Sequence, residues 1–402
     1  MTEEPPATHT RSPIFQDRPW PDNNGVPINA HGGGVMFHRG VYYWFGESYR
    51  DANSTEPQAT GVRCYSSTDL CNWKDEGIVL ARVKDPRSEI TEGCVIERPK
   101  VIYNATTRKF ALWFHLELNG EGYKAARSGV AVADRPTGPY VYLRSERPDA
   151  GTWPINATEA QKAGPKEVEA LKGMSFSGGP SPETPKHNLL ARDFHGGQMA
   201  RDMNLFVDDD GKAYHLFASE ENSTLHLSRL SDDYLSHSGE WVRLFEYKWN
   251  EAPALCKHKG RYWMISSGCT GWAPNPARSA VADSIWGPWK ELGNPCIEDA
   301  PTGETLKLTP SQWKELGYPS VGGIPRKYTL GADHTFGGQS TCLLPIDGKP
   351  GAFIAMFDVW RPTNLMTSGY VWLPVVFGRD RFTVTWSDPL HPSLLDGRAT
   401  CG

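Results

Sequence analysis

A carboxylate and two cations interrupt an apolar stretch in the segment CVIERPKVIYN, residues 94–104. The apolar triplets on each side indicate a buried strand, yet Pro99 has no N–H to donate and is unusual within a central strand. Charged groups inside a core cost free energy unless they are paired or hydrated. Glu97, Arg98 and Lys100 therefore predict a hydrated pocket in which these charges face one another.

Similar polar groups interrupt apolar runs elsewhere in the chain. They occur in NAHGGG (29–34), WFGES (44–48), ARDMNLF (200–206), NEAPAL (250–255), CTGWAPNP (269–276), GGQSTC (337–342) and DVWRP (358–362). Carboxylates among Trp and Tyr side chains are the groups that glycoside hydrolysis uses, because an acid protonates the leaving oxygen and aromatic faces bind sugar rings. HGGG occurs without the G-x-S-x-G nucleophile motif of an esterase, and no Walker loop is present.

The elements that would position these residues form a repeat. Five aromatic alternating runs each follow a polar turn and precede a second strand–turn–strand unit. They are GVYYWFGES (40–48), FALWFHLE (110–117), KAYHLFASE (212–220), RYWMISSG (261–268) and GAFIAMFD (351–358). Four short strands repeated five times predict an all-β, five-bladed β-propeller, in which the inner strands surround one axis and bring the polar segments to one mouth.

The uneven spacing of the repeats predicts loop insertions at about 144–200 and 293–336. Short helices are expected within them at 166–173 and 309–317. The predicted organisation is an N-terminal extension (1–27), the propeller (28–392) and a C-terminal tail (393–402).

Composition narrows the class of partner. A net charge of −5 over 402 residues predicts no nucleic-acid partner, and the lack of a long apolar run predicts no membrane span. The first residues lack the basic and apolar regions of a signal peptide, so we expect a cytoplasmic protein unless a leader was removed. No Cys or His spacing is typical of a metal site, so neither a metal nor another cofactor is expected. The sequence does not predict the oligomeric state.

Several of these segments together resemble glycoside hydrolase family 43, a family of five-bladed propellers that invert the anomeric centre. The similarity rests on VIERPKVIYN, EAPALCKHKGRYWMISSGCTGWAPNP, SIWGPW, GGQST and DVWRP followed by YVWLPVVF, and it extends from about Ile28 to Trp386. It is greatest to the exo-galactanase-like branch, which acts on arabinogalactan-type side chains.

The resemblance implies three catalytic residues. Glu251 in NEAPAL matches the general acid of the family. Most members carry an Asp base in the first blade, whereas the matching stretch here, NAHGGG, has no Asp. Gln339 in FGGQSTC matches a Gln that takes the base position in the galactanase-like branch, either as an imidic acid or by holding water. Glu97 matches the third essential carboxylate, which would polarise that amide or balance positive charge on the sugar.

The resemblance also implies substrate contacts. The matching positions are Glu47, Tyr123, Asp202, Asn222 and Gly271, with Trp272 and Trp360 as aromatic platforms and Arg361 as a ligand for a carboxylate or hydroxyl. His31 and His115 are candidates for holding a water or an ion on the axis, and His31 is the next candidate for the base.

The predicted function is therefore that of an exo-acting, inverting glycosidase that removes terminal galactose from an oligo- or polysaccharide such as galactan or arabinogalactan. An α-L-arabinofuranosidase and a galactofuranosidase remain alternatives, because the two furanose rings are similar. A sugar-binding propeller without turnover is the alternative from another class, since the first-blade Asp is missing.

Overall fold

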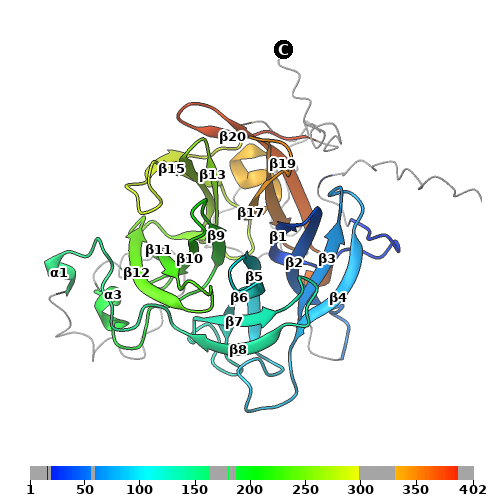
Figure 1. The fold of residues 1–402 in the computed structure, drawn as a ribbon, viewed down its shortest axis with the longest axis horizontal. Helices are drawn as coiled ribbons and strands as arrows, with labels where there is room; N and C mark the ends of the chain where they lie inside the picture. Colours follow the sequence, from blue (N-terminus) through cyan, green and yellow to red (C-terminus); the bar gives the residue numbers. More distant parts are fainter. Residues whose placement is uncertain are drawn as a thin grey trace, which may run out of the picture.

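Five four-stranded antiparallel sheets surround one axis in the computed structural model (Figure 1). The structure describes residues 16, 20–55, 59–162, 180, 184, 187–297 and 331–387. This arrangement confirms the predicted all-β five-bladed propeller. The expected helices at 166–173 and 309–317 lie outside the described residues.

Each blade is one continuous segment of chain. The first comprises β1 (His31–His38), β2 (Val41–Tyr49), β3 (Ala59–Ser67) and β4 (Lys74–Ala81); the second β5 (Val95–Asn104), β6 (Lys109–Glu117), β7 (Arg127–Ala133) and β8 (Val141–Glu146). The third comprises β9 (Met203–Val207), β10 (Ala213–Ser219), β11 (Thr224–Leu230) and β12 (His237–Leu244); the fourth β13 (Asn250–His258), β14 (Arg261–Gly268), β15 (Arg278–Ala282) and β16 (Lys290–Gly293). The fifth comprises β17 (Gln339–Pro345), β18 (Phe353–Val359), β19 (Gly369–Phe377) and β20 (Phe382–Val384).

Short helices lie outside the sheets. The described parts of the two predicted insertions contain α1 (Glu159–Lys162), α3 (Leu189–Arg192) and the 3-10 segment η2 (Ala332–Gly337), and a further 3-10 turn η3 (Leu365–Thr367) follows β18. Among the described residues, no helix has the length and apolar character needed to cross a membrane.

The inner strands β1, β5, β13 and β17 each carry a register irregularity near the start of the strand. It lies between His31 and Gly34 in β1, between Glu97 and Lys100 in β5, between Glu251 and Ala254 in β13, and between Ser340 and Cys342 in β17. Each inner strand is also the edge strand of its blade. Pro99 therefore lies in a bulge on an edge strand, where its missing N–H removes no ladder bond.

In three of these bulges a left-handed residue follows the residue at the pocket. Gly32, Arg98 and Ala252 have φ values of 61°, 54° and 49°. This local turn breaks the alternation of the strand, so that the side chain before it leaves the ladder. His31, Glu97 and Glu251 thus occupy equivalent positions in three blades.

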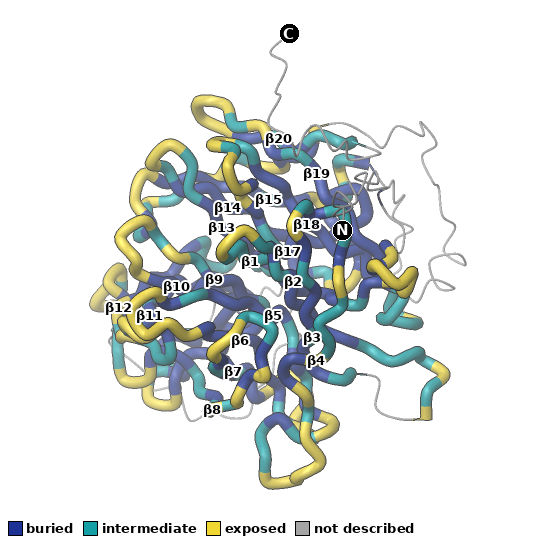
Figure 2. Tube along the Cα trace, turned by 45° about the vertical axis from the view of Figure 1, so that its right-hand side comes forward, coloured by how far each residue is buried: buried dark blue, intermediate teal, exposed yellow. Residues whose placement is uncertain are grey.

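The hydrophobic core consists of five clusters, one between each pair of neighbouring blades. Buried segments accordingly alternate with exposed turns around the ring (Figure 2). The aromatic runs that indicated the repeat form the second strand of each blade, where they face these clusters.

The cluster between the first and fifth blades includes residues from the predicted N-terminal extension. Trp20 packs edge-on against Trp44 and Trp372, with centroid separations of 6.1 and 5.1 Å. The Gln16 side chain continues the sheet edge, because its Nε2 donates to the carbonyl of Trp372 at 2.8 Å and its Oε1 accepts from the N–H of Trp372 at 2.8 Å. Trp20 thus packs against both end blades, and Gln16 fixes the N-terminal segment to the fifth blade.

Trp20→Ala should lower the free energy of unfolding by about 3–5 kcal/mol, because it leaves a cavity between two blades. Urea denaturation followed by tryptophan fluorescence measures the loss. Val141→Ala is the control, since Val141 is 62% exposed. A loss for Trp20→Ala no larger than that of the control would show that this residue does not hold the ring closed.

Candidate active site

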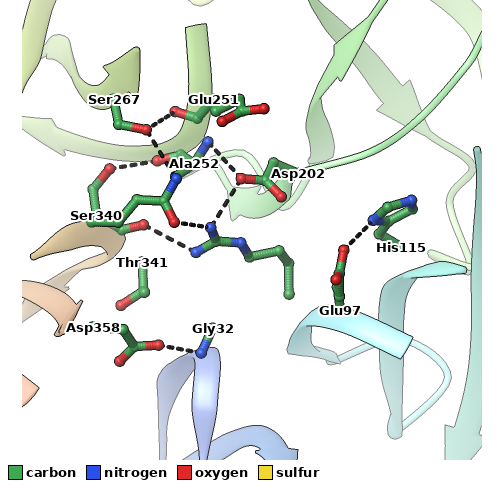
Figure 3. Close-up of polar contacts among 12 residues, drawn as sticks. Gly32, Glu97, His115, Asp202, Glu251, Ala252, Ser267, Ser340, Thr341 and Asp358 are labelled. Atoms are coloured by element: carbon green, nitrogen blue, oxygen red, sulfur yellow. Dashed lines mark hydrogen bonds and ion pairs between the residues drawn. The ribbon is translucent and has the colours of Figure 1, made fainter. Parts of the chain in front are cut away.

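The residues at the starts of the inner strands face one another around the axis (Figure 3). Glu97 comes from β5, Glu251 from β13 and Gln339 from β17, while Asp202 immediately precedes β9. The structure therefore brings the three predicted catalytic residues into one polar pocket with Asp202.

Arg98 connects the blades at the centre of this pocket. Its guanidinium donates to Gln339 Oε1 at 2.5 Å and lies 3.0 Å from Asp202 Oδ2, and its backbone N–H donates to Glu47 Oε1 at 2.9 Å. Arg98 is only 5% exposed, yet the surrounding carboxylates raise its pKa against the effect of burial, so it stays charged. Of the ERPK charges, Arg98 is thus paired with carboxylates of other blades, whereas Lys100 Nζ donates to the carbonyls of Gly32 and Arg98.

Glu251 is held in its protonated form. Burial and the neighbouring Asp202 carboxylate raise the pKa of Glu251 to about 8, although Arg98 acts in the opposite direction. Asn222 Nδ2 donates to Glu251 Oε1 at 2.9 Å, and Asp202 Oδ2 accepts from the N–H of Ala252 at 3.0 Å. These contacts fix both the side chain and the backbone of Glu251, and the thiol of Cys269 also bonds to its carboxyl group.

Glu97, in contrast, is held ionised. His115 Nδ1 lies 3.0 Å from its carboxylate, and the hydroxyl of Tyr123 donates to it at 2.6 Å. Burial opposes ionisation, but His115 and Tyr123 keep the pKa of Glu97 below its ordinary value. The second nitrogen of His115 lies 2.9 Å from the fully buried Glu117, and the two carboxylates raise the pKa of His115 to about 9 despite its burial.

Glu117 was not predicted as a site residue. It follows His115 by two residues in the run FALWFHLE, so both side chains leave β6 on the same face. The two-residue spacing could have indicated that Glu117 accompanies His115. It does so only once β6 is known to lie beside the pocket.

Gln339 has both ends of its amide engaged. Its Oε1 accepts from Arg98 and, at 2.9 Å, from Trp360 Nε1, while its Nε2 donates to Ser267 Oγ at 3.2 Å. Ser267 Oγ also donates to the carbonyl of Glu251 at 3.4 Å. An imidic acid would carry a hydroxyl at the oxygen, where its neighbours are two donors and no acceptor. The contacts therefore favour the ordinary amide.

Two further acids line the axis. Burial and the charge of Glu97 raise the pKa of Glu47 to about 8, and the hydroxyl of Tyr49 donates to its second oxygen. Burial also raises the pKa of Asp358 to about 7, although the N–H of Gly32 donates to it. Asp358 was noted as part of the polar segment DVWRP, but the sequence did not predict that its side chain points toward the axis.

The remaining predicted substrate contacts fall into two groups. Trp272 and Tyr123 are 41% and 48% exposed, and Gly271 and Arg361 are at least partly exposed, so all four are accessible to a sugar. Trp360 and His31 are buried instead. Arg98 covers the ring of Trp360 at 5.6 Å, and His31 stacks on Tyr370 at 5.3 Å with its pKa lowered by burial to about 3. These placements do not favour Trp360 as a platform or His31 as a sugar ligand or base.

One group of side chains has the geometry of a metal site. Glu97, His115 and Asp202 each offer a ligand atom within 4.8 Å of the others. However, both nitrogens of His115 face carboxylates, and the Arg98 guanidinium already lies against Asp202. A protonated imidazole and a guanidinium supply the positive charge that a metal would bring, so the donor set does not fit a cation. Sequence spacing did not predict this cluster.

Comparisons with known proteins give one family. The sequence profile of "Glycosyl hydrolases family 43" matches residues 181–308. A solved GH43 β-1,3-galactosidase in complex with galactodeoxynojirimycin is 47% identical, with a TM-score of 0.79, over 93% of this chain and 99% of that one. No curated protein matches the chain.

Two exo-β-1,3-galactanases are also similar. The enzyme from Clostridium thermocellum is 33% identical over 93% of this chain and 65% of that one, with a TM-score of 0.67. A variant of the enzyme from Phanerochaete chrysosporium, solved with β-1,3-galactotriose, is 27% identical over 96% of this chain and 70% of that one, with a TM-score of 0.68.

Glu251 should titrate near pH 8, since burial and Asp202 disfavour its charged form. NMR of protein with ¹³C-labelled glutamate carboxyl groups measures this, and Glu251→Gln identifies the signal by its loss. A Glu251 signal that titrates in the ordinary range of about 4–5 would contradict the protonated form.

Proposed function

Because the chain belongs to glycosyl hydrolase family 43, we propose that it is an exo-acting, inverting hydrolase that removes terminal galactose from β-1,3-linked galactan or arabinogalactan-type glycans. The observation that supports this proposal is the pairing of a protonated Glu251 with an ionised Glu97 in one axial pocket. Two carboxyl groups with opposite protonation states are what acid-assisted glycoside cleavage requires. The similarity to β-1,3-galactosidases and exo-β-1,3-galactanases supports the sugar and the linkage.

Glu251 is the general acid in this mechanism. Its carboxyl group donates the proton to the glycosidic oxygen as the bond to the anomeric carbon breaks, and the leaving sugar departs as an alcohol. Asn222 holds Oε1, and Asp202 keeps the carboxyl group protonated until it reacts. Because the pKa is raised to about 8, the acid form predominates at neutral pH and is lost as the pH rises through that value.

Gln339 and Glu97 serve the water side. The amide oxygen of Gln339 is occupied by Arg98 and Trp360, so we assign to Gln339 the positioning of the attacking water through its Nε2 group and not the removal of a proton. Glu97 is the ionised carboxylate that balances positive charge at the anomeric carbon and accepts the proton of the water. Arg98, not Glu97, makes the contact that polarises the amide.

Substrate recognition involves the remaining pocket residues. The protonated carboxyl of Glu47 offers one donor and one acceptor, which suits a sugar hydroxyl. Tyr123, Trp272 and Gly271 lie at accessible positions, where the two aromatic faces provide apolar surface for a ring.

The wild-type protein should release galactose from β-1,3-galactobiose, and ¹H NMR at early times should show the α-anomer first, because one displacement inverts the β-linkage. Glu251→Gln should reduce this rate at least about a thousandfold, while hydrolysis of a dinitrophenyl galactoside, whose leaving group needs no proton, falls much less. Glu246→Gln, a partly exposed acid away from the pocket, is the control.

Release of arabinose from an arabinofuranoside in place of galactose would identify the alternative specificity. Sugar binding without release from any substrate would identify a non-catalytic propeller. An equal loss on both galactosides would remove Glu251 from the acid role.

Gln339→Ala and Glu97→Gln should each lower kcat by roughly three orders of magnitude, because water is then misplaced or the positive charge is unbalanced. The kcat of the double variant should be little lower than that of the less active single variant, since the two residues act on one water. Single-turnover kinetics measures both effects.

Gln198→Ala is the matched control, because Gln198 is also buried and donates to the carbonyl of Leu190 outside the pocket. A rise in KM with kcat unchanged would make Gln339 a sugar ligand only.

A further inference from the structure

A left-handed turn joins β10 and β11 beside the acid. Its three residues Glu220, Glu221 and Asn222 have φ values of 50°, 59° and 65°, and none of them is glycine. Each of the two glutamates costs roughly 1–2 kcal/mol in backbone energy here, while Asn tolerates this conformation better, so the turn persists because its surroundings determine it. Strain of this kind, next to a functional group, points to a positioning role.

Each side chain of the turn has its own buried partners. Glu220 accepts from Arg243 and His226 on the side away from the pocket. Asn222 donates to Glu251. Between them, the carboxylate of Glu221 is 4% exposed and accepts from Arg192 of α3 at 3.0 Å and from Arg201 at 3.3 Å.

The Arg201–Glu221 ion pair connects the two residues that act on the acid. Arg201 directly precedes Asp202, and Glu221 directly precedes Asn222. The same guanidinium group donates to the carbonyl of Tyr123 at 2.7 Å. One ion pair thus joins the backbone segments that carry Asp202 and Asn222, and the same arginine also holds the loop that carries the Tyr123 hydroxyl to Glu97.

We propose that the buried Arg201–Glu221 pair, held by Arg192 from the insertion between the second and third blades, positions the general acid and its two direct partners. This inference rests on the proposed function, because it takes Glu251 as the acid. Arg201 and Glu221 do not touch the reacting atoms in this view; they act through Asp202 and Asn222.

The pair also sets the electrostatic balance at the acid. Charged and titratable groups around Glu251 are Asp202, Arg98, Arg201 and the thiol of Cys269. Those around Glu221 are Arg192, Arg201 and, at longer range, Arg147. The charge of Arg201 lowers the pKa of Glu251. The opposite charge of Glu221, 3.3 Å from the guanidinium, weakens this effect.

Two substitutions should therefore shift the acid in opposite directions. Glu221→Gln keeps the shape of the side chain but leaves Arg201 uncompensated, so the basic limb of the pH–kcat/KM profile should move down by about half a pH unit. Arg201→Met removes the cation, so the limb should move up by a similar amount. Both variants should lose more rate on β-1,3-galactobiose than on a dinitrophenyl galactoside.

Glu220→Gln is the matched control for these variants. Glu220 lies in the same turn, is fully buried and is equally engaged by an arginine, but it faces away from Glu251. It should lower the melting temperature and leave the basic limb in place. Should Glu221→Gln fail to fold, Arg192→Lys tests the same clamp, because it keeps the charge but loses the two-sided contact to Asp193 and Glu221; its galactobiose rate should fall more than its dinitrophenyl galactoside rate.

If Glu221→Gln and Arg201→Met both lower the melting temperature but leave the basic limb of the pH–kcat/KM profile unchanged, the inference is wrong and the ion pair has only a structural role. Equal losses on the two galactosides in Arg192→Lys would lead to the same conclusion. Failure of the proposed function gives a different result, because Glu251→Gln would then retain the wild-type basic limb.

Discussion

A guanidinium buried on the axis of the propeller is the constraint on which the rest of the site depends. Arg98 cannot release its charge and has little access to water, so groups from other blades must come to it. The first blade supplies Glu47, the third supplies Asp202 and the fifth supplies Gln339. Because each partner is fixed on its own blade, the packing between blades sets the geometry of the site, and the left-handed backbone at Arg98 is stabilised by the contacts that it makes possible.

The same local motif carries two carboxyl groups with different chemistry. Glu97 and Glu251 hold equivalent bulge positions, and each precedes a left-handed residue and a proline. Their protonation differs because Glu97 lies beside an imidazole backed by Glu117, whereas Glu251 lies beside Asp202 and receives a neutral amide donor. The neighbouring side chains, and not the local backbone conformation, therefore determine which of the two carboxyl groups is protonated.

The propeller could be predicted because its aromatic second strands repeat, and the pocket could be predicted because polar residues interrupt the inner strands. The contacts that decide roles could not. Arg98 was visible as a charge, but its partners come from three other blades and depend on closure of the ring. Trp360 and His31 carry no sign in their residue type that they are buried. The Glu220–Asn222 turn contains no glycine, and Asn222 alone, a residue type that tolerates a left-handed backbone, does not indicate three such residues in succession.

The closure of the ring bears on how the protein loses activity. Among the described residues each blade is a separate continuous segment, so no strand is exchanged where the first and fifth blades meet. Trp20 packs across that junction, and the bond from Gly32 to Asp358 crosses it. Separation at this junction would pull Gln339 away from Arg98 while every ladder of hydrogen bonds within a blade stayed intact. Thermal inactivation through this route would precede any loss of β-structure, because the ring would open between the first and fifth blades and separate the catalytic residues while each blade stayed folded.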